Sequence, residues 1–151
     1  MTTATLAEVE ATQLKLAAMI AELKAAIPTL FNVPAAQIEL HKGERYAGVV
    51  LGADGMPTHH LVLLPGEAES VAWGAAKDWA VTTGGELPTR QEQALLYANL
   101  KSQFQAAWYW SGQEHETNGS YAWFQGFDDG NQNNGHKGYE GRARAVRRIS
   151  A

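Results

Sequence analysis

The sequence predicts an α+β protein in which a long N-terminal helix precedes a compact body. Near the N-terminus, a stretch of Ala, Leu, Glu and Lys without Gly or Pro has the composition of a helix. Further along, short apolar segments alternate with turns that contain Gly and Asp, as expected for β-strands. Between these segments, one helix begins with a clear capping pattern. We therefore expect two domains, at residues 1–34 and 35–151.

The composition excludes several kinds of site and partner. The 151 residues carry a formal net charge of −4, which argues against nucleic acid as the main partner. The sequence has no cysteine, which excludes disulfides, thiolate metal sites and a cysteine nucleophile, and suits a reducing compartment. The start lacks the basic residues and apolar run of a signal peptide, and no segment approaches the roughly 20 apolar residues of a membrane span. We expect synthesis in the cytoplasm and no membrane insertion.

The N-terminal helix is predicted over residues 5–27, and its apolar residues follow a heptad pattern. They recur at alternating steps of three and four, as in the seam of a coiled coil. The seam positions are Leu6, Val9, Gln13, Leu16, Ile20, Leu23 and Ile27, continued by Leu30. Alanines beside the seam allow other copies to approach closely. The pattern predicts a homo-oligomer, either dimer or trimer, and the alternative is an amphipathic helix packed on its own domain.

Two prolines mark the boundary between the helix and the body. Pro28 ends the helix, and Pro34 follows six residues later. The apolar side chains between them, at residues 30–33, are expected to dock the helix onto the body. Residues 35–41 could add one further helical turn.

The first half of the body is predicted to be a β-hairpin followed by a helix. Its strands are expected at residues 46–51 and 59–64, joined by a turn at Asp54-Gly55. The helix is expected at residues 70–83, and two consecutive glycines would end it. Its predicted inward stripe consists of Val71, Ala75, Ala76, Trp79 and Ala80.

A second body helix has the sharpest start signal in the sequence. Thr89 as the N-cap and Glu92 three residues later form a capping box, and Leu87-Pro88 fixes the entry of the chain. The chain beyond this helix is predicted to be strands and loops. The expected strands are residues 108–111, 120–127 and 142–149, and the polar loops are residues 112–119 and 128–141.

Several segments of the body resemble one known fold. They are GELPTRQE at residues 85–92, YWS at 109–111, AWF at 122–124 and RAVR at 144–147, with HLVLLP at 60–65 before them. Residues 46–149 resemble the C-type-lectin-like fold of bacterial and phage proteins, in the family named for the C-terminal domain of a Legionella collagen-like adhesin. Distant relatives are the formylglycine-generating enzymes and the major tropism determinant, the receptor-binding tip of a Bordetella phage.

The resemblance implies a function in binding. It suggests a phage or prophage tail-associated protein, a fibre or tail-tip component of the virion, that contacts other tail proteins and a host-surface glycan or protein receptor. The alternatives are a structural virion subunit that binds protein neighbours, and a bacterial surface adhesin. Many secreted relatives carry a cysteine where this chain has Ala145, and the formylglycine-type enzymes need cysteines. That activity is therefore excluded, and no enzyme activity is expected.

The ligand surface is predicted on the two polar loops and the adjoining strand edge. These segments are dense in Asn, Asp, Glu and His, and Tyr121 and Tyr139 lie at their margins. Tyrosine supplies a large contact area at little entropic cost. The candidate ligand-binding residues are Glu114, His115, Asn118, Tyr121, Asp128, Asn131, Asn133, Asn134, His136 and Tyr139. The simpler alternative is that these loops are solvated connections.

Metal binding is weakly indicated, and we predict neither a metal site nor a cofactor. The run from Asp129 to Glu140 overlaps the pattern of a calcium-binding loop, with oxygen ligands at loop positions 1, 3, 5 and 12. Asn134 replaces the glycine required at position 6, so plain turn chemistry explains the run as well. His59 and His60 point to opposite faces of a strand and cannot hold one ion together.

Three aromatic residues match family positions that build the core. Trp110, Trp123 and Phe127 are therefore expected to be buried.

Overall fold

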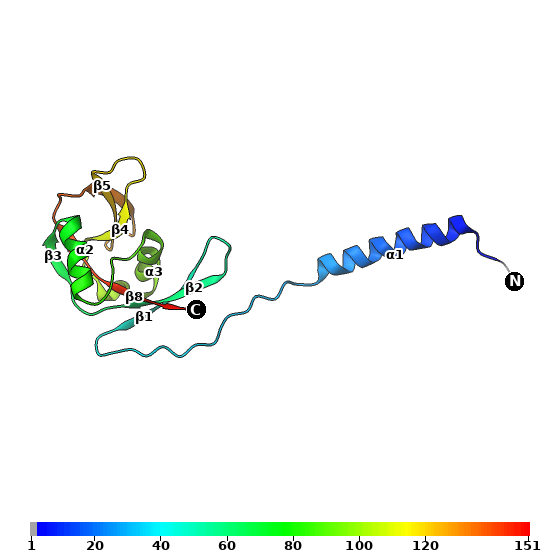
Figure 1. Ribbon diagram of the computed structural model, residues 1–151, viewed down its shortest axis with the longest axis horizontal. Coiled ribbons are helices and arrows are strands. Elements are labelled where there is room, and N and C mark those ends of the chain that lie inside the picture. The colour runs from blue at the N-terminus through cyan, green and yellow to red at the C-terminus, as the bar shows by residue number, and fades with distance from the viewer. Residues whose placement is uncertain (1–2) are drawn as a thin grey trace. The chain divides into compact units, whose positions relative to one another are not determined.

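The computed structural model describes residues 3–151, and it confirms an α+β protein with an N-terminal helix (Figure 1). The chain divides after Val33 into two compact units. The first contains helix α1, Leu6–Ala26. Thr5 caps it: its side chain accepts from the Glu8 amide at 3.3 Å, and the Glu8 carboxylate accepts from the Thr5 amide at 2.7 Å. None of the residues of α1 is buried.

The segment after α1 is extended. Residues 35–41 contain no helical turn, so that expectation is wrong. A single helical turn fixes several residues for one hydrogen bond and is unfavourable unless packing supports it, and most of these residues are exposed. Leu30, Phe31 and Val33 are exposed, and their docking onto the body stays a prediction.

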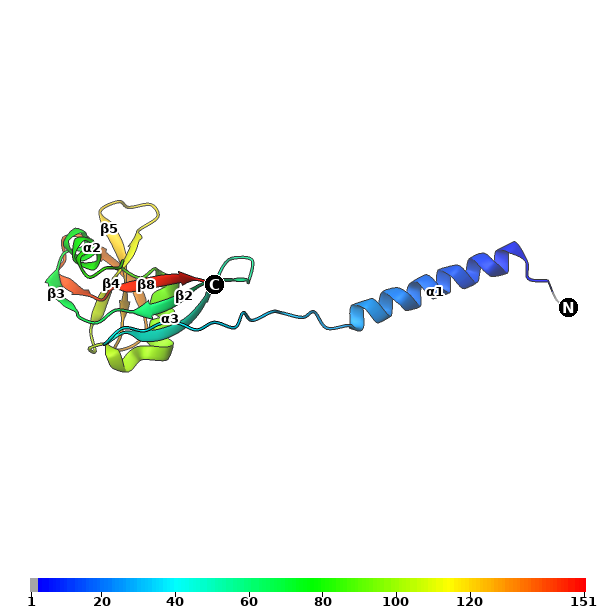
Figure 2. The ribbon, with the colours of Figure 1, turned by 60° about the horizontal axis from the view of Figure 1, so that its bottom comes forward.

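The body begins and ends in one antiparallel sheet of three strands. Strand β1 is Arg45–Leu51, β2 is Pro57–Leu63 and β8 is Val146–Ser150, in the order β1-β2-β8. Figure 2 shows β8, in red, beside β2. Arg147 of β8 also holds the segment before β1, because its guanidinium donates to the Glu44 carboxylate at 2.7 and 3.1 Å and to the Glu39 carbonyl at 2.6 Å.

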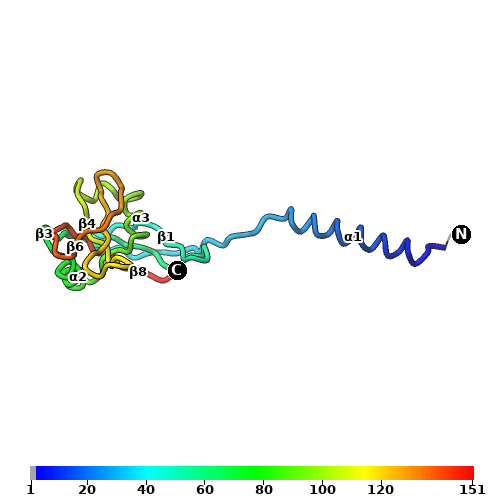
Figure 3. Tube along the Cα trace, turned by 90° about the horizontal axis from the view of Figure 1, so that it is seen from above, coloured from blue at the N-terminus to red at the C-terminus, as the bar shows by residue number. Residues whose placement is uncertain are grey.

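The second sheet has five strands in the order β3-β7-β4-β5-β6. They are β3, Ala68–Val71; β4, Trp108–Glu114; β5, Tyr121–Gly126; β6, Gln132–His136; and β7, Gly141–Ala143. Figure 3 shows the same chain as a trace and labels β3, β4 and β6 on the body. Strand β6 lies at one edge and pairs with β5 along its whole length.

This sheet corrects three expectations. The predicted loop 128–141 contains strand β6, so Asn133, Asn134 and His136 lie on a strand. The predicted strand 142–149 is divided between β7 and β8, which belong to different sheets. The predicted loop 112–119 begins only after β4 has continued to Glu114.

Helix α2, Trp73–Thr82, starts later than predicted because β3 occupies the segment before it. Its buried side chains are Trp73, Ala76 and Ala80, whereas Ala75 is exposed and Val71 belongs to β3. The helix ends as the two glycines predict. Gly84 has φ +89°, and the amides of Gly84 and Gly85 donate to the carbonyls of Val81 and Ala80 at 3.0 Å each.

Helix α3, Arg90–Leu100, has the predicted capping box, which is confirmed. The Thr89 hydroxyl accepts from the Glu92 amide at 3.2 Å, and the Glu92 carboxylate accepts from the Thr89 amide at 2.8 Å. A short 3-10 turn, Lys101–Gln103, follows the helix.

Two clusters of buried residues form the core of the body. Trp110 belongs to the cluster that includes Trp73 and Ala76 of α2, and Phe127 to the cluster that includes Leu96 of α3. Trp110 is fully buried and Phe127 is 2% exposed, as predicted. Trp123 is half-buried and belongs to neither cluster, so its assignment to the core is wrong. No helix among residues 3–151 is long and apolar enough to cross a membrane.

Candidate functional site

The alternation of side chains along β5 separates a core face from an accessible face of the second sheet. Ala122 and Phe124 point to the α2 side, where they join the core. The residues between them point the other way, together with the β6 residues directly opposite, because antiparallel partners share a face. We call this surface the β5–β6 face; its residues are Tyr121, Trp123, Gln125, Gln132, Asn134 and His136.

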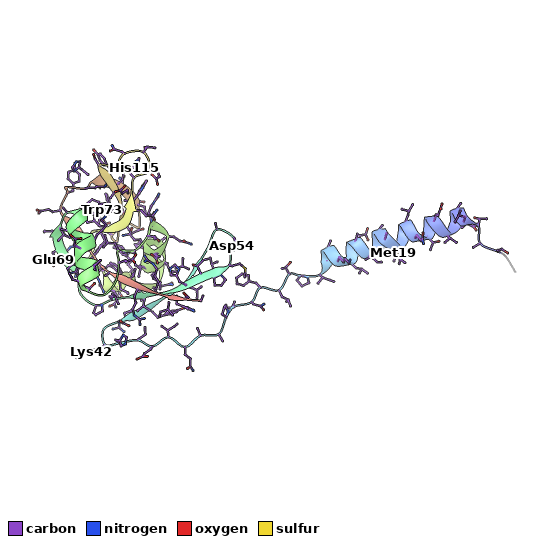
Figure 4. All side chains as sticks on the ribbon, in the orientation of Figure 1. Met19, Lys42, Asp54, Glu69, Trp73 and His115 are labelled. Atoms are coloured by element: carbon purple, nitrogen blue, oxygen red, sulfur yellow. The ribbon has the colours of Figure 1, made fainter. Side chains whose placement is uncertain are left out.

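Trp123 is the centre of the β5–β6 face. The guanidinium of Arg90 lies 3.6 Å from the centre of its ring, and the imidazole of His115 is stacked on it at 5.7 Å with an interplanar angle of 16°. Its Nε1 donates to the Glu116 carboxylate at 3.3 Å, and Glu116 lies 3.7 Å from Arg90. Figure 4 marks His115 in the hairpin that joins β4 to β5. These contacts hold the ring in place and leave it half-exposed.

A second aromatic group begins at the end of the same face and continues around the edge strand to Tyr139, which lies against Gly135 on the Phe124 side. The rings of Tyr121 and His136 are 5.7 Å apart, and those of His136 and Tyr139 are 5.9 Å apart. His136 Nδ1 accepts from the Gly138 amide at 3.0 Å. Within residues 3–151, no hydrogen bond occupies the Tyr121 hydroxyl, His136 Nε2 or the side-chain amide of Asn134. These three groups are free to bind a polar ligand.

A glutamine network fixes the β5–β6 face to α3. Gln132 donates to the Arg90 carbonyl at 2.6 Å and to Gln125 at 3.0 Å, and it accepts from Arg90 Nε at 3.0 Å. Gln113 accepts from the Arg90 amide at 2.7 Å. A shallow cleft of about 390 Å³ lies over this network, and Tyr97 lines it. Because these side-chain amides are hydrogen-bonded to Arg90, to each other or to nearby backbone, the network is a rigid support for the exposed residues.

The predicted site residues divide into two groups. His115, Tyr121, Asn134 and His136 come together at the β5–β6 face, and Tyr139 touches His136. Their binding roles stay predictions.

The other candidates are used in local structure. Glu114 shares the Ala122 side of the sheet and pairs with Lys137 at 2.8 Å, a contact that lowers the pKa of Glu114. Lys137 in turn lies 4.6 Å from the ring of Trp73, which is also marked in Figure 4. Asn118 accepts from the Ser120 amide at 3.1 Å in the loop between β4 and β5.

Three more candidate residues are used in the turn between β5 and β6 and at the start of β6. Asp128 accepts from the Asp129 amide at 2.9 Å, and Asn131 donates through its amide and side chain to Asp129 at 2.9 and 3.0 Å. Asn133 shares the Phe124 side of the sheet, and its side chain accepts from the Asn134 amide at 2.8 Å. That bond satisfies a backbone donor on the edge strand.

The same turn explains the calcium-like pattern. Asp129 closes a tight turn, and the residues after it are extended in β6 rather than wrapped around an ion. Among residues 3–151, no three His, Asp or Glu side chains are grouped as metal ligands.

Sequence reasoning missed Arg90, Glu116, Trp123 and Gln132 as parts of this surface. One signal was present for Trp123. Side chains alternate between the two sides of a strand, so Trp123 lies on the same side of β5 as Tyr121 and on the opposite side from Ala122 and Phe124. The contacts of Arg90 and Gln132 join segments 42 residues apart, and no local pattern predicts them.

No protein-family model matches the chain, and no curated protein sequence matches it. Function is therefore inferred from the chemistry of the β5–β6 face.

One further polar cluster has the form of a nucleophile chain. The Thr58 hydroxyl lies 3.0 Å from His59 Nδ1, and His59 Nε2 lies 2.8 Å from the Glu92 carboxylate. However, the hydroxyl donates to the Val50 carbonyl, and Arg148 binds both oxygens of Glu92 at 2.7 and 2.8 Å. Burial opposes ionisation of Glu92, but these hydrogen bonds outweigh it and lower its pKa to about 2. The cluster braces β2 and β8 against α3.

Proposed function

We propose that this chain recognises a host-surface receptor as a phage or prophage tail-associated protein, and that the β5–β6 face makes the contact. The observation that carries the proposal is the set of unused polar groups on Tyr121, Asn134 and His136 beside the half-exposed ring of Trp123. Aromatic rings and free amides on a rigid sheet are the usual components of a recognition surface.

The body is proposed to be C-type-lectin-like. Two features support this: the resemblance of its motifs, and a first and last strand that share one sheet. The phage assignment rests on the resemblance and is compatible with a chain that contains no cysteine.

The ligand is proposed to be neutral and polar, either a glycan or a protein surface. On the β5–β6 face the cation of Arg90 is engaged by Trp123, Gln132 and Glu116, so no free cation is left to attract an anionic ligand. A single small face of this kind binds weakly. Self-association through α1 would raise the overall affinity, because several linked faces engage a surface together.

The test compares two triple variants of the full-length chain. The face variant carries Tyr121→Ala, Asn134→Ala and His136→Ala. The control variant carries Glu114→Ala, Asn118→Ala and Asn133→Ala, which are polar changes away from the free groups of that face. Melting temperature and binding of the labelled chain to a panel of intact bacterial cells are measured for both.

We expect binding to be lost at least tenfold in the face variant and retained in the control, with folding intact in both. Protease or periodate treatment of the cells then separates protein from glycan receptors. Binding that survives in the face variant would contradict the proposal. A chain that binds no cell but is found within the assembled particle would instead favour the structural virion subunit.

A further inference from the structure

The seam of α1 is an exposed apolar surface that needs a partner. Leu6 is 75% exposed, Leu23 is 66% exposed and Ile27 is 68% exposed. In proteins most helical stability comes from packing of an apolar side, and none of the 21 residues of α1 is buried. The heptad spacing matches other copies of the same helix. The remaining question is how those copies are oriented.

Gln13 discriminates between the two orientations. It occupies an a position of the heptad, in the layer between Val9 and Leu16. In a parallel, in-register bundle, every seam position faces its own counterpart, so the Gln13 side chains of all copies share one layer. An amide has both donors and an acceptor, and these side chains can therefore bond one another inside the seam.

In an antiparallel bundle, a positions face d positions. Every d position within α1 is aliphatic: Val9, Leu16 and Leu23. Gln13 would then face an aliphatic residue in each possible register, and its amide would be buried without a partner. Burying an unpaired amide carries the full cost of removing it from water.

Charges on the flanks favour the other orientation, but weakly. Glu10 and Lys24 both lie at e positions. In an antiparallel pair with Val9 opposite Ile27, Glu10 of each helix would lie beside Lys24 of the other, which gives two ion pairs. In a parallel bundle, both residues would lie beside the uncharged g positions. Such ion pairs are exposed to solvent, and each contributes less than an unpaired buried amide costs.

We propose that α1 associates with other copies of this chain in parallel and in register, and that the shared layer of Gln13 side chains sets this orientation. The inference rests on the self-association that the proposed function uses. Its consequence is that every body leaves the bundle at the same end, so that several β5–β6 faces are available to one target surface.

The natural absence of cysteine makes the orientation directly measurable. Two single variants of the full-length chain, Val9→Cys and Ile27→Cys, are oxidised separately and as a mixture. The Ala11→Cys variant, at the f position opposite the seam, is the matched control. We expect each seam variant to form disulfide-linked dimers with itself, and the control to form none above background. The proposal would be overturned if neither seam variant linked to itself and disulfides formed only between Val9→Cys and Ile27→Cys chains in the mixture.

The role of Gln13 is tested by adding Gln13→Leu to both cysteine variants. A seam with only aliphatic residues should lose its preference for the parallel orientation. The disulfide between Val9→Cys and Ile27→Cys chains should then form in addition to the disulfides between identical chains. An unchanged pattern would overturn the assignment to Gln13. Light scattering on the cysteine-free chain gives the number of copies. A monomer would overturn both self-association and this inference, whereas receptor binding by the β5–β6 face is measured separately.

Discussion

The guanidinium of Arg90 lies 3.6 Å from the centre of the Trp123 ring and joins the first residue of α3 to the middle of β5. Arg90 also holds Gln132 through two hydrogen bonds, so three segments meet at one side chain. The arrangement presents the indole at the surface, in contrast to the fully buried ring of Trp110.

Replacing Trp123 with Ala should therefore affect binding more than folding. We expect a loss of about 1–2 kcal/mol in the free energy of unfolding, since the ring loses its contact with Arg90 but leaves no large cavity. The Trp110→Ala variant should lose about 3–5 kcal/mol, because it empties fully buried volume. Chemical denaturation of the two variants side by side measures the difference. Equal losses would mean that Trp123 belongs to the core after all.

The capping box of α3 should contribute about 1 kcal/mol to the free energy of unfolding. Thr89→Ala removes the hydroxyl that accepts from the Glu92 amide. The melting temperature should fall, while binding to cells stays unchanged because Thr89 is not on the β5–β6 face. Ser120→Ala, in an exposed loop, serves as the control. An unaltered melting temperature in Thr89→Ala would show that its cap contributes nothing.

Acid should destabilise the body over a defined range of pH. Hydrogen bonds outweigh burial and hold the pKa of Glu92 at about 2 in the folded chain, below the ordinary value of 4.5. The unfolded chain therefore takes up a proton first as the pH falls. The stabilisation, about 3 kcal/mol at most, is present above pH 4.5 and is lost between pH 4.5 and 2.

Denaturation measured from pH 7 to pH 2 tests this. The Glu92→Gln variant should be less stable at neutral pH and should show a shallower decline in the acid range. Glu140→Gln, at an exposed position, should follow the unmodified chain. If stability declined with pH equally in Glu92→Gln and in the unmodified chain, the loss of stability in acid would not come from Glu92.

Gly141 should tolerate no side chain. A Cβ atom at this position would overlap the ring of Trp108, which packs against the core. We expect Gly141→Ala to cost about 1–3 kcal/mol, because the indole must move. Gly119→Ala is a matched control, since a Cβ there meets nothing within 4 Å. A stable Gly141→Ala variant would show that Trp108 can shift freely.

Local signals predicted much of the fold. The capping box at Thr89, the glycines after α2 and the heptads of α1 depend on residues close in sequence. All three segments form helices, and the start of α3 and the end of α2 lie where these signals predict. Strand β6 was missed because its sequence, QNNGH, contains no apolar residue. It is an edge strand, and its pairing with β5 determines its conformation.

The candidate site was harder to predict for a related reason. Trp123 was assigned to the core because it matches a position that builds the core in the family that the chain resembles. Its exposure depends on which side of β5 the ring occupies and on its contact with Arg90, which belongs to a different segment. The side chains of Asn118, Asp128 and Asn133 accept from nearby backbone amides, and that of Asn131 donates to Asp129. Composition alone cannot separate this role from ligand binding.

The contacts of Arg147 with Glu44 and the Glu39 carbonyl have a mechanical consequence. Tension applied at the N-terminal end of the body reaches Glu39 and Glu44 along the chain before it reaches β1. Arg147 transfers part of that load to β8, at the far edge of the same three-stranded sheet. Without this link, β1 would carry the load alone and peel from β2 one hydrogen bond at a time. With it, β8 shares the load, so that rupture of the β1–β2 ladder alone does not release the segment before β1.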